Sequence, residues 1–155
     1  MSVLDDVADL PRQGALMGLD PGSKTIGVAV SDGLRLTATG LETIRRRKFA
    51  EDAARLAEIA RHRAIVGVVV GLPLNMDGSA GPRAQSARAF ARNVAAALDL
   101  PVALFDERLS SFAAEEAMMA SGVPARRRAG RIDSIAAAII LRGALDTLTG
   151  ADGSA

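Results

Sequence analysis

Residues 18–32 read Gly18-Leu19-Asp20-Pro21-Gly22-Ser23-Lys24-Thr25-Ile26-Gly27-Val28-Ala29-Val30-Ser31-Asp32 and carry the strongest structural information in this chain. Two apolar runs, residues 15–19 and 26–30, flank a short turn at residues 21–23. Apolar runs joined by a Pro- and Gly-containing turn predict a β-hairpin. The first strand ends on one acid, Asp20. A carboxylate fixed beside a turn rich in backbone N–H groups suits a metal ion and a phosphate.

Apolar periodicity along the rest of the chain predicts the remaining elements. They are, in order, a strand over residues 35–43, a helix over 48–62, a strand over 65–70, a helix over 82–98, a strand over 102–105, a helix from Ser110 or Ser111 to Gly122, and a helix over 132–148. This order predicts an α/β fold with a mixed five-stranded sheet, in which three antiparallel strands precede βαβα units and helices cover both faces. We expect one domain over residues 1–155, with a core at about 14–148 and short flexible ends.

Composition excludes several classes of protein. The chain has no cysteine, so disulfides, thiolate metal sites and cysteine nucleophiles are ruled out. No apolar run is long enough to span a bilayer, and the acidic N-terminus does not resemble a signal peptide. These features predict a cytoplasmic protein without a membrane partner. No pattern identifies a dimer surface, so the oligomeric state stays open.

The formal net charge is only +1, but the basic residues are concentrated in two runs. Residues 45–48 form one run, and Arg126, Arg127, Arg128 and Arg131 form the other. Either run alone is typical of a solvated surface. Two such runs beside candidate site elements favour a groove that binds the phosphates of a nucleic acid.

Three acids, Asp20, Glu107 and Asp133, fall at the ends of predicted elements. In a mixed sheet with the first hairpin strand at its centre, these positions can converge. Carboxylates without histidine or cysteine partners select hard divalent ions, Mg²⁺ or Mn²⁺. Two such ions support attack of water on a phosphodiester. The alternative for each acid alone is a helix cap or a surface carboxylate, although an acid inside an apolar strand is costly unless it is used.

Other polar residues are weaker candidates for contacts with substrate. Lys24 lies in the hairpin turn, Asn75 lies in a loop after a buried strand, and Arg108 follows the last strand. Solvation, turn chemistry and an ion pair are the respective alternatives. Asp106 and Glu107 are adjacent on a strand and therefore point to opposite faces. Glu107 is the expected ligand, and Asp106 is its alternative.

Four blocks in this order resemble the YqgF family, also called RuvX, of the RNase H-like superfamily. They are Gly18-Leu19-Asp20-Pro21-Gly22-Ser23-Lys24 with the run to Asp32, then Val69-Val70-Gly71-Leu72-Pro73-Leu74-Asn75-Met76-Asp77-Gly78, then Asp106-Glu107-Arg108-Leu109-Ser110-Ser111, then Ile132-Asp133-Ser134-Ile135-Ala136-Ala137-Ala138. The resemblance covers roughly residues 14–147. It departs from the family pattern at residues 126–131, where arginines stand in place of the expected lysines.

The resemblance implies an RNase H-like fold with Asp20, Glu107 and Asp133 as the catalytic, metal-binding acids. It implies a nuclease that processes the 5′ end of pre-16S rRNA in ribosome biogenesis, with structured RNA or a ribosomal particle as its partner. The older family label implies a Holliday junction resolvase that cuts branched DNA. A third interpretation is a non-catalytic RNA-binding assembly factor. A nucleotide-binding domain of the actin and sugar-kinase type ranks last, because that fold needs a second domain around ATP.

Overall fold

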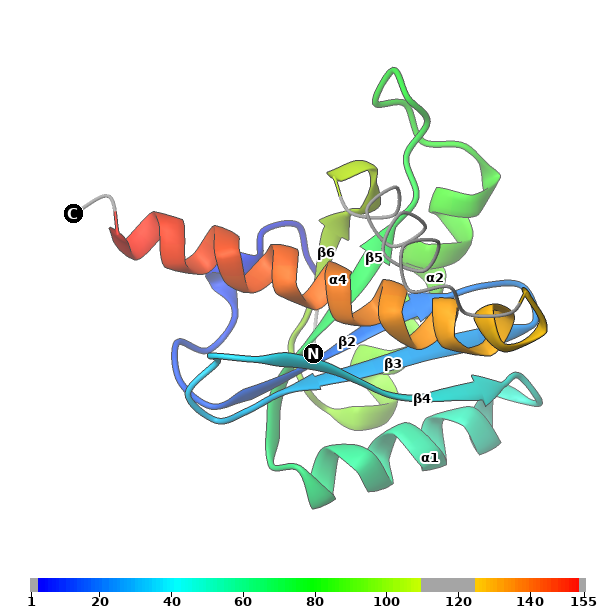
Figure 1. Ribbon diagram of the computed structural model, residues 1–155, viewed down its shortest axis with the longest axis horizontal. Helices are drawn as coiled ribbons and strands as arrows, with labels where there is room; N and C mark the ends of the chain where they lie inside the picture. Colours follow the sequence, from blue (N-terminus) through cyan, green and yellow to red (C-terminus); the bar gives the residue numbers. More distant parts are fainter. Residues whose placement is uncertain (1–2, 110–124, 154–155) are drawn as a thin grey trace.

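A six-stranded sheet in the order β1-β6-β5-β2-β3-β4 forms the centre of the computed structural model (Figure 1). The structure describes the backbone of residues 3–109 and 125–153 and the side chains of residues 3–108 and 133–149. The strands are β1 (Val3–Leu4), β2 (Ala15–Pro21), β3 (Thr25–Ser31), β4 (Ala38–Arg45), β5 (Ile65–Leu72) and β6 (Val102–Asp106). Strands β2, β3 and β4 are antiparallel, whereas β2, β5, β6 and β1 run parallel. The predicted mixed α/β sheet is confirmed, with one additional strand at its edge.

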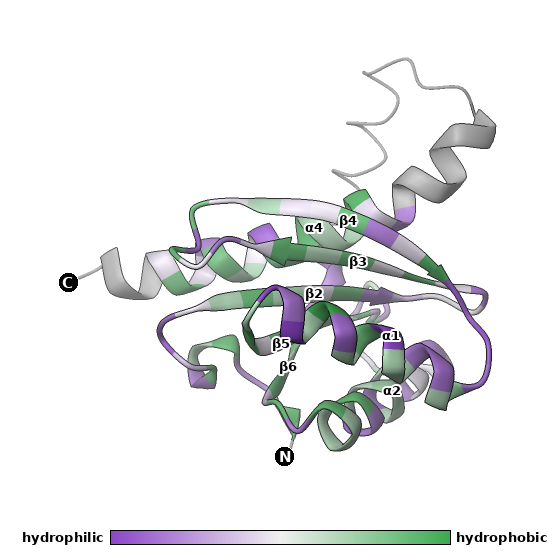
Figure 2. Ribbon diagram, turned by 90° about the horizontal axis from the view of Figure 1, so that it is seen from below, coloured by the Kyte–Doolittle hydropathy of each residue, from purple (hydrophilic) through white to green (hydrophobic). Residues whose placement is uncertain are grey.

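Helices cover both faces of this sheet, as predicted. Helices α1 (Phe49–His62) and α2 (Pro82–Leu98) pack on one face, and α4 (Ala125–Gly153) lies across the other (Figure 2). Two short 3-10 helices, η1 (Val7–Asp9) and η2 (Glu107–Leu109), complete the described elements. Within the described part of the chain, no helix has the length and apolarity needed to cross a membrane.

The sheet has a hydrophobic core on each face, and this explains the continuous apolar runs in the sequence. Met17 and Leu19 of β2 belong to the core under α1 and α2, whereas Leu16 belongs to the core under α4. All three side chains are fully buried. A strand buried on both faces is apolar at every position, so the run reads as continuous and not as alternating. Strand β2 is therefore an interior strand, and Asp20 stands at its end.

The N-terminal segment differs from the expectation of a flexible end. Strand β1 pairs in parallel with β6, placing Val3 opposite Val102. Val7 and Leu10 are only 4% and 3% exposed and pack in the core under α4. Apolar residues are spaced among the acids of this segment, and they bury enough surface to order it.

Two other boundaries differ from the predictions. Strand β4 begins at Ala38 and not at residue 35, because Asp32 Oδ1 accepts hydrogen bonds from the backbone N–H groups of Leu36 and Thr37 and holds the chain in a turn. Helix α4 begins at Ala125 and not at residue 132. Arginine and alanine are strong helix formers, so the basic run extends the helix in the N-terminal direction. The helix expected from Ser110 or Ser111 to Gly122 lies outside the described residues.

Candidate functional site

Asp20 lies at the end of β2, between β3 and β5. Its neighbour across the antiparallel pair is Gly27 of β3. On the other side β2 pairs with β5, with Leu19 beside Val70. The carboxylate is half-buried. Strand β2 therefore projects one acid from the interior of the sheet, and the two flanking strands control what can approach it.

A glycine on β3 brings helix α4 to this acid. A Cβ atom at Gly27 would lie 1.8 Å from the backbone oxygen of Asp133, so only glycine allows the helix to sit this close to the strand. The Asp133 side chain accepts a hydrogen bond from Thr25, with 2.7 Å between Thr25 Oγ1 and Asp133 Oδ2. The helix backbone thus rests on the residue opposite Asp20, and Asp133 lies close enough for its charge to raise the pKa of Asp20.

A glycine on β5 makes room for the third acid. A Cβ atom at Gly71 would lie 2.9 Å from Cγ and 3.0 Å from Oε1 of Glu107, which follows β6 at the start of η2. Glu107 forms a side-chain hydrogen bond with Asp20. Asp106, the alternative to Glu107, instead forms an ion pair with Arg108, with 2.6 Å between Asp106 Oδ2 and Arg108 Nη2. The structure therefore brings Glu107, and not Asp106, to Asp20.

The shared environment of the two acids changes their protonation. Burial, followed by the hydrogen bond and the charge of Asp20, raises the pKa of Glu107 to about 8. Burial also raises the pKa of Asp20, while the hydrogen bond from Glu107 opposes that rise. These directions fit a protonated Glu107 that donates to an ionised Asp20, because two carboxylates in contact do not both ionise easily.

Arg83 at the start of α2 is a cation beside this pair that the sequence did not single out. Its charge lowers the pKa values of both Asp20 and Glu107. Pro82 at the first helical position fixes where this turn begins. An arginine early in a helix that follows a Gly-Pro pair was the available clue, but only the fold places that helix at the acids.

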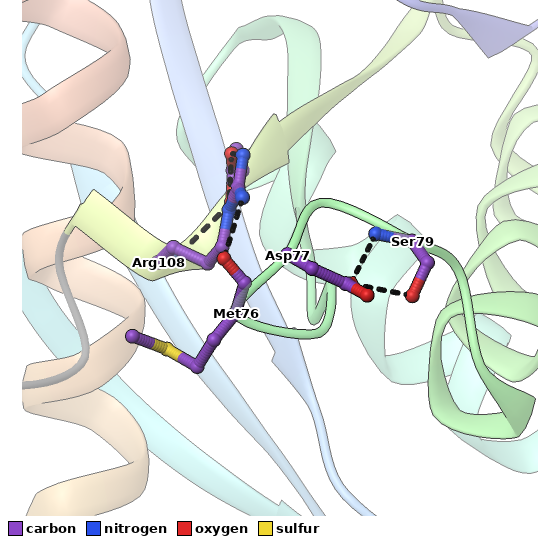
Figure 3. A network of polar contacts seen from close by, with 5 residues as sticks. Met76, Asp77, Ser79 and Arg108 are labelled. Carbon is purple, nitrogen blue, oxygen red and sulfur yellow. Dashed lines mark hydrogen bonds and ion pairs between the residues drawn. The ribbon is translucent and has the colours of Figure 1, made fainter.

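The weaker candidate residues have internal partners. Nδ2 of Asn75 donates to Oγ of Ser79 within the loop after β5, over 3.0 Å. Figure 3 shows Arg108 reaching the Met76 carbonyl of the same loop, over 3.4 Å, and Asp77 accepting from the backbone N–H and hydroxyl of Ser79. Arg108 therefore contacts this loop through the Met76 carbonyl, while it remains paired with Asp106 at the end of β6.

The other predicted substrate contacts are basic residues. Lys24 is exposed in the turn between β2 and β3, and its backbone oxygen accepts a hydrogen bond from Arg46. The side chains of residues 126–131 lie outside the described part of the structure, so it does not test that basic run.

The donor set fits a hard divalent cation in its chemistry. Asp20, Glu107 and Asp133 supply only carboxylate oxygens, which Mg²⁺ and Mn²⁺ prefer. A cation beside Asp20 and Glu107 would displace the proton that Glu107 holds and would offset the burial and the neighbouring negative charge that raise both pKa values. Among the described residues, no group of three acids or histidines already stands in a complete ligand arrangement. The pair could thus supply two ligands, with Asp133 as an adjacent third acid held by Thr25.

The chain has an RNase H-like fold. A solved structure of Thermus thermophilus RuvC in complex with a Holliday junction substrate superposes with a TM-score of 0.53 at 19% identity, over 88% of this chain and 96% of that one. The yeast mitochondrial Holliday junction resolvase superposes with a TM-score of 0.54 at 11% identity, over 95% and 85%. At these identities the likeness concerns the fold.

Sequence comparison gives the family. A family model described as "RuvX: Holliday junction resolvase" matches residues 14–147, and the chain belongs to this family. A Cereibacter sphaeroides protein named "Putative pre-16S rRNA nuclease" is 61% identical over 144 residues, which cover 93% of this chain and 90% of that protein. A Bradyrhizobium protein of the same name is 60% identical over 139 residues, covering 90% and 86%.

Proposed function

We propose that this protein is a metal-dependent nuclease that processes the 5′ end of pre-16S rRNA. The observation that carries the proposal is the hydrogen-bonded contact between Asp20 and Glu107 at the end of an interior strand, with Asp133 close enough to act on Asp20 by its charge. The names of relatives about 60% identical over nearly the whole chain support the choice of substrate. A cytoplasmic site of action fits this role.

In this proposal the three acids share one task, and Thr25 and Arg83 support them. Asp20, Glu107 and Asp133 would hold Mg²⁺ or Mn²⁺, which supplies an activated water and stabilises the leaving oxygen of the phosphodiester. Glu107 must release its proton before it can act as a ligand, because a protonated carboxyl is a poor one. Thr25 orients Asp133 through its 2.7 Å hydrogen bond. Arg83 lowers the pKa values of Asp20 and Glu107 and so favours their ionised, metal-binding forms.

A resolvase of branched DNA is the second candidate. The description of the matching family favours it, as does the fold shared with a RuvC bound to a Holliday junction substrate and with a mitochondrial Holliday junction resolvase. The same acids would serve both reactions, since each is hydrolysis of a phosphodiester. The two candidates therefore differ in the nucleic acid that the surrounding surface binds, and a substrate comparison separates them.

The deciding experiment compares wild type with Asp20→Asn on two substrates, a 5′-extended 16S rRNA precursor and a synthetic four-way DNA junction, with Mn²⁺ and after chelation. We expect cleavage of the precursor by wild type alone, and a loss of about 10³-fold or more in Asp20→Asn. The variant should remain folded, because burial of the charged form of Asp20 is a cost that the amide avoids. Calorimetric titration with Mn²⁺ gives a second readout, in which the variant should bind weakly.

Three outcomes would change this assignment. Symmetric cutting of the junction without cutting of the precursor would make the protein a resolvase. Tight RNA binding without cleavage of either substrate would favour an assembly factor. Cleavage that survives complete chelation, or equal cleavage by Asp20→Asn, would contradict the metal mechanism.

A further inference from the structure

A cavity of about 240 Å³ lies between the turn that follows Asp20 and the start of helix α2. Its lining includes Pro21, Arg46, Pro73, Pro82, Arg83 and Ser86, and we call it the arginine pocket. Arg83 belongs both to this lining and to the electrostatic surroundings of Asp20 and Glu107. None of the three acids lines the pocket, but Pro21 follows Asp20 directly in β2, so the pocket lies next to the candidate catalytic site.

Arg46 is held in a fixed orientation at this pocket. Its Nη1 donates a 2.6 Å hydrogen bond to the backbone oxygen of Gly22, and its Cζ lies 5.3 Å from the centroid of the Phe90 ring. The ring is itself fixed by an edge-to-face contact with Phe49, with the centroids 6.2 Å apart. A planar guanidinium held over a buried ring loses little further entropy when it binds an anion.

Within the described part of the chain, neither Arg46 nor Arg83 forms a direct ion pair with a carboxylate, although the charge of Arg83 acts on Asp20 and Glu107. There, the ion pairs to carboxylates are formed by Arg55, Arg88, Arg108 and Arg142. The first turn of α2 contains no acid, so its positive dipole end adds to the charge of Arg83. Two guanidinium groups at one cavity favour an anion, and phosphate oxygens match their paired N–H donors.

The apolar residues that line the arginine pocket indicate which chemical group is attached to the anion. Pro21, Pro73, Pro82 and Ala87 make much of the wall apolar. The cavity volume also exceeds what a lone phosphate needs. A sugar attached to the phosphate would cover this apolar wall, whereas a free inorganic ion would leave it open to water.

We propose that the arginine pocket binds a phosphate of the substrate strand, together with its sugar, beside the phosphodiester that the acids hydrolyse. This inference rests on the proposed nuclease function for the identity of the ligand. The pocket would fix the strand in position, so that the reacting phosphate is presented to Asp20 and Glu107. An internal phosphodiester and a terminal 5′-phosphate offer the same chemistry to the two arginines.

The test measures binding of a short fluorescent single-stranded RNA by anisotropy in EDTA, where metal-dependent cleavage is absent. Arg46→Gln and Arg83→Gln are compared with Arg61→Gln and Arg92→Gln, which remove the same charge from exposed positions away from the pocket lining. We expect each pocket variant to weaken binding by about tenfold and each control by less than about twofold. Each pocket variant should also reduce the slope of log K against log salt by about 0.7.

Two further comparisons make the result specific. Equal losses with 5′-phosphorylated and 5′-hydroxyl RNA would assign the pocket to an internal phosphodiester, and a loss confined to the phosphorylated RNA would assign it to the terminal phosphate. Arg46→Lys keeps the charge without the planar group and should bind with intermediate affinity. If Arg46→Gln has a lower melting temperature than wild type, the binding result of Arg83→Gln decides the question alone, because Arg83 occupies an exposed helical position.

Wild-type affinity in both pocket variants, or equal losses in the controls, would overturn the inference. These outcomes are separable from failure of the proposed function. RNA binding that depends on the pocket, in a protein that never cleaves RNA, would contradict the nuclease and leave the pocket assigned. If Arg46→Gln and Arg83→Gln bind RNA with normal affinity and cleave it at the normal rate, the pocket assignment is contradicted and the nuclease function stands.

Discussion

At the scale of single residues, the proton shared by Glu107 and Asp20 is the main property of this site. Burial and the neighbouring carboxylate raise the pKa of Glu107 from the ordinary value of 4.5 to about 8. We therefore expect Glu107 of the metal-free protein to hold a proton near neutral pH, which a divalent cation must displace. Metal affinity should consequently rise with pH as Glu107 ionises.

The same shift predicts how stability depends on pH without metal. Between pH 4.5 and about 8, the folded protein keeps a proton on Glu107 that the unfolded chain has released. The folded state binds more protons, so the free energy of unfolding falls as pH rises through this window. Because the group is partly exposed, we expect a fall of roughly 2 kcal/mol.

Thermal and denaturant unfolding of wild type and Glu107→Gln in EDTA, from about pH 5.5 to 8, measures this effect. The amide keeps a donor for Asp20 but does not titrate, so most of the decline should disappear in the variant. Parallel stability curves for the two proteins would contradict the shared proton.

At the scale of elements, helix α4 positions Asp133, and glycines of the sheet determine how closely this helix packs on the strands. Gly18, Gly27 and Gly40, on three adjacent strands, each lie against the backbone or Cβ atoms of this helix. The acid is thus positioned by main-chain contact between a helix and a sheet. Such contact fixes position better than a loop would.

Gly27→Ala tests this role. The added Cβ would meet the backbone oxygen of Asp133 at 1.8 Å, and a backbone atom cannot move aside alone. We expect a loss of about 3 kcal/mol or more in the free energy of unfolding, together with loss of cleavage, because the whole helix must shift. Denaturant unfolding and the precursor assay measure the two effects.

Gly33→Ala is the matched control, since nothing lies within 4 Å of a Cβ atom at that position. It should remain within about 0.5 kcal/mol of wild type. Equal stability in the two variants would show that α4 does not depend on close approach at Gly27.

At the scale of the whole molecule, the sequence predicts the layers better than the contacts between them. The hairpin, the parallel strands and the helix at residues 82–98 follow from local periodicity and turn chemistry. Asp20 could be chosen because an acid inside an apolar strand is costly, whereas Glu107 and Asp133 could be chosen only as acids at the ends of other predicted elements. The depth of α4, the proton on Glu107 and the placement of Arg46 beside Arg83 depend on contacts between distant segments, which no local pattern encodes.

The small overall charge makes the second basic run important for RNA binding. The chain carries a net charge of only +1, so strong RNA binding requires local concentration of its cations. Arg126, Arg127 and Arg128 occur in the first turn of α4, on the helix that carries Asp133 toward the sheet. If all three contact phosphates, replacing them with glutamine should lower the slope of log K against log salt for single-stranded RNA by about 2.

Anisotropy titrations over a range of salt concentrations would measure this slope. A triple variant of Arg61, Arg63 and Arg92, which are exposed on α1, just after it and on α2, changes the net charge equally. If net charge alone governed binding, the slope of log K against log salt would fall by the same amount in both triple variants. If the protein presents a defined path for the strand, only the variant in α4 would lose it, and the run would extend the arginine pocket's contacts along the substrate.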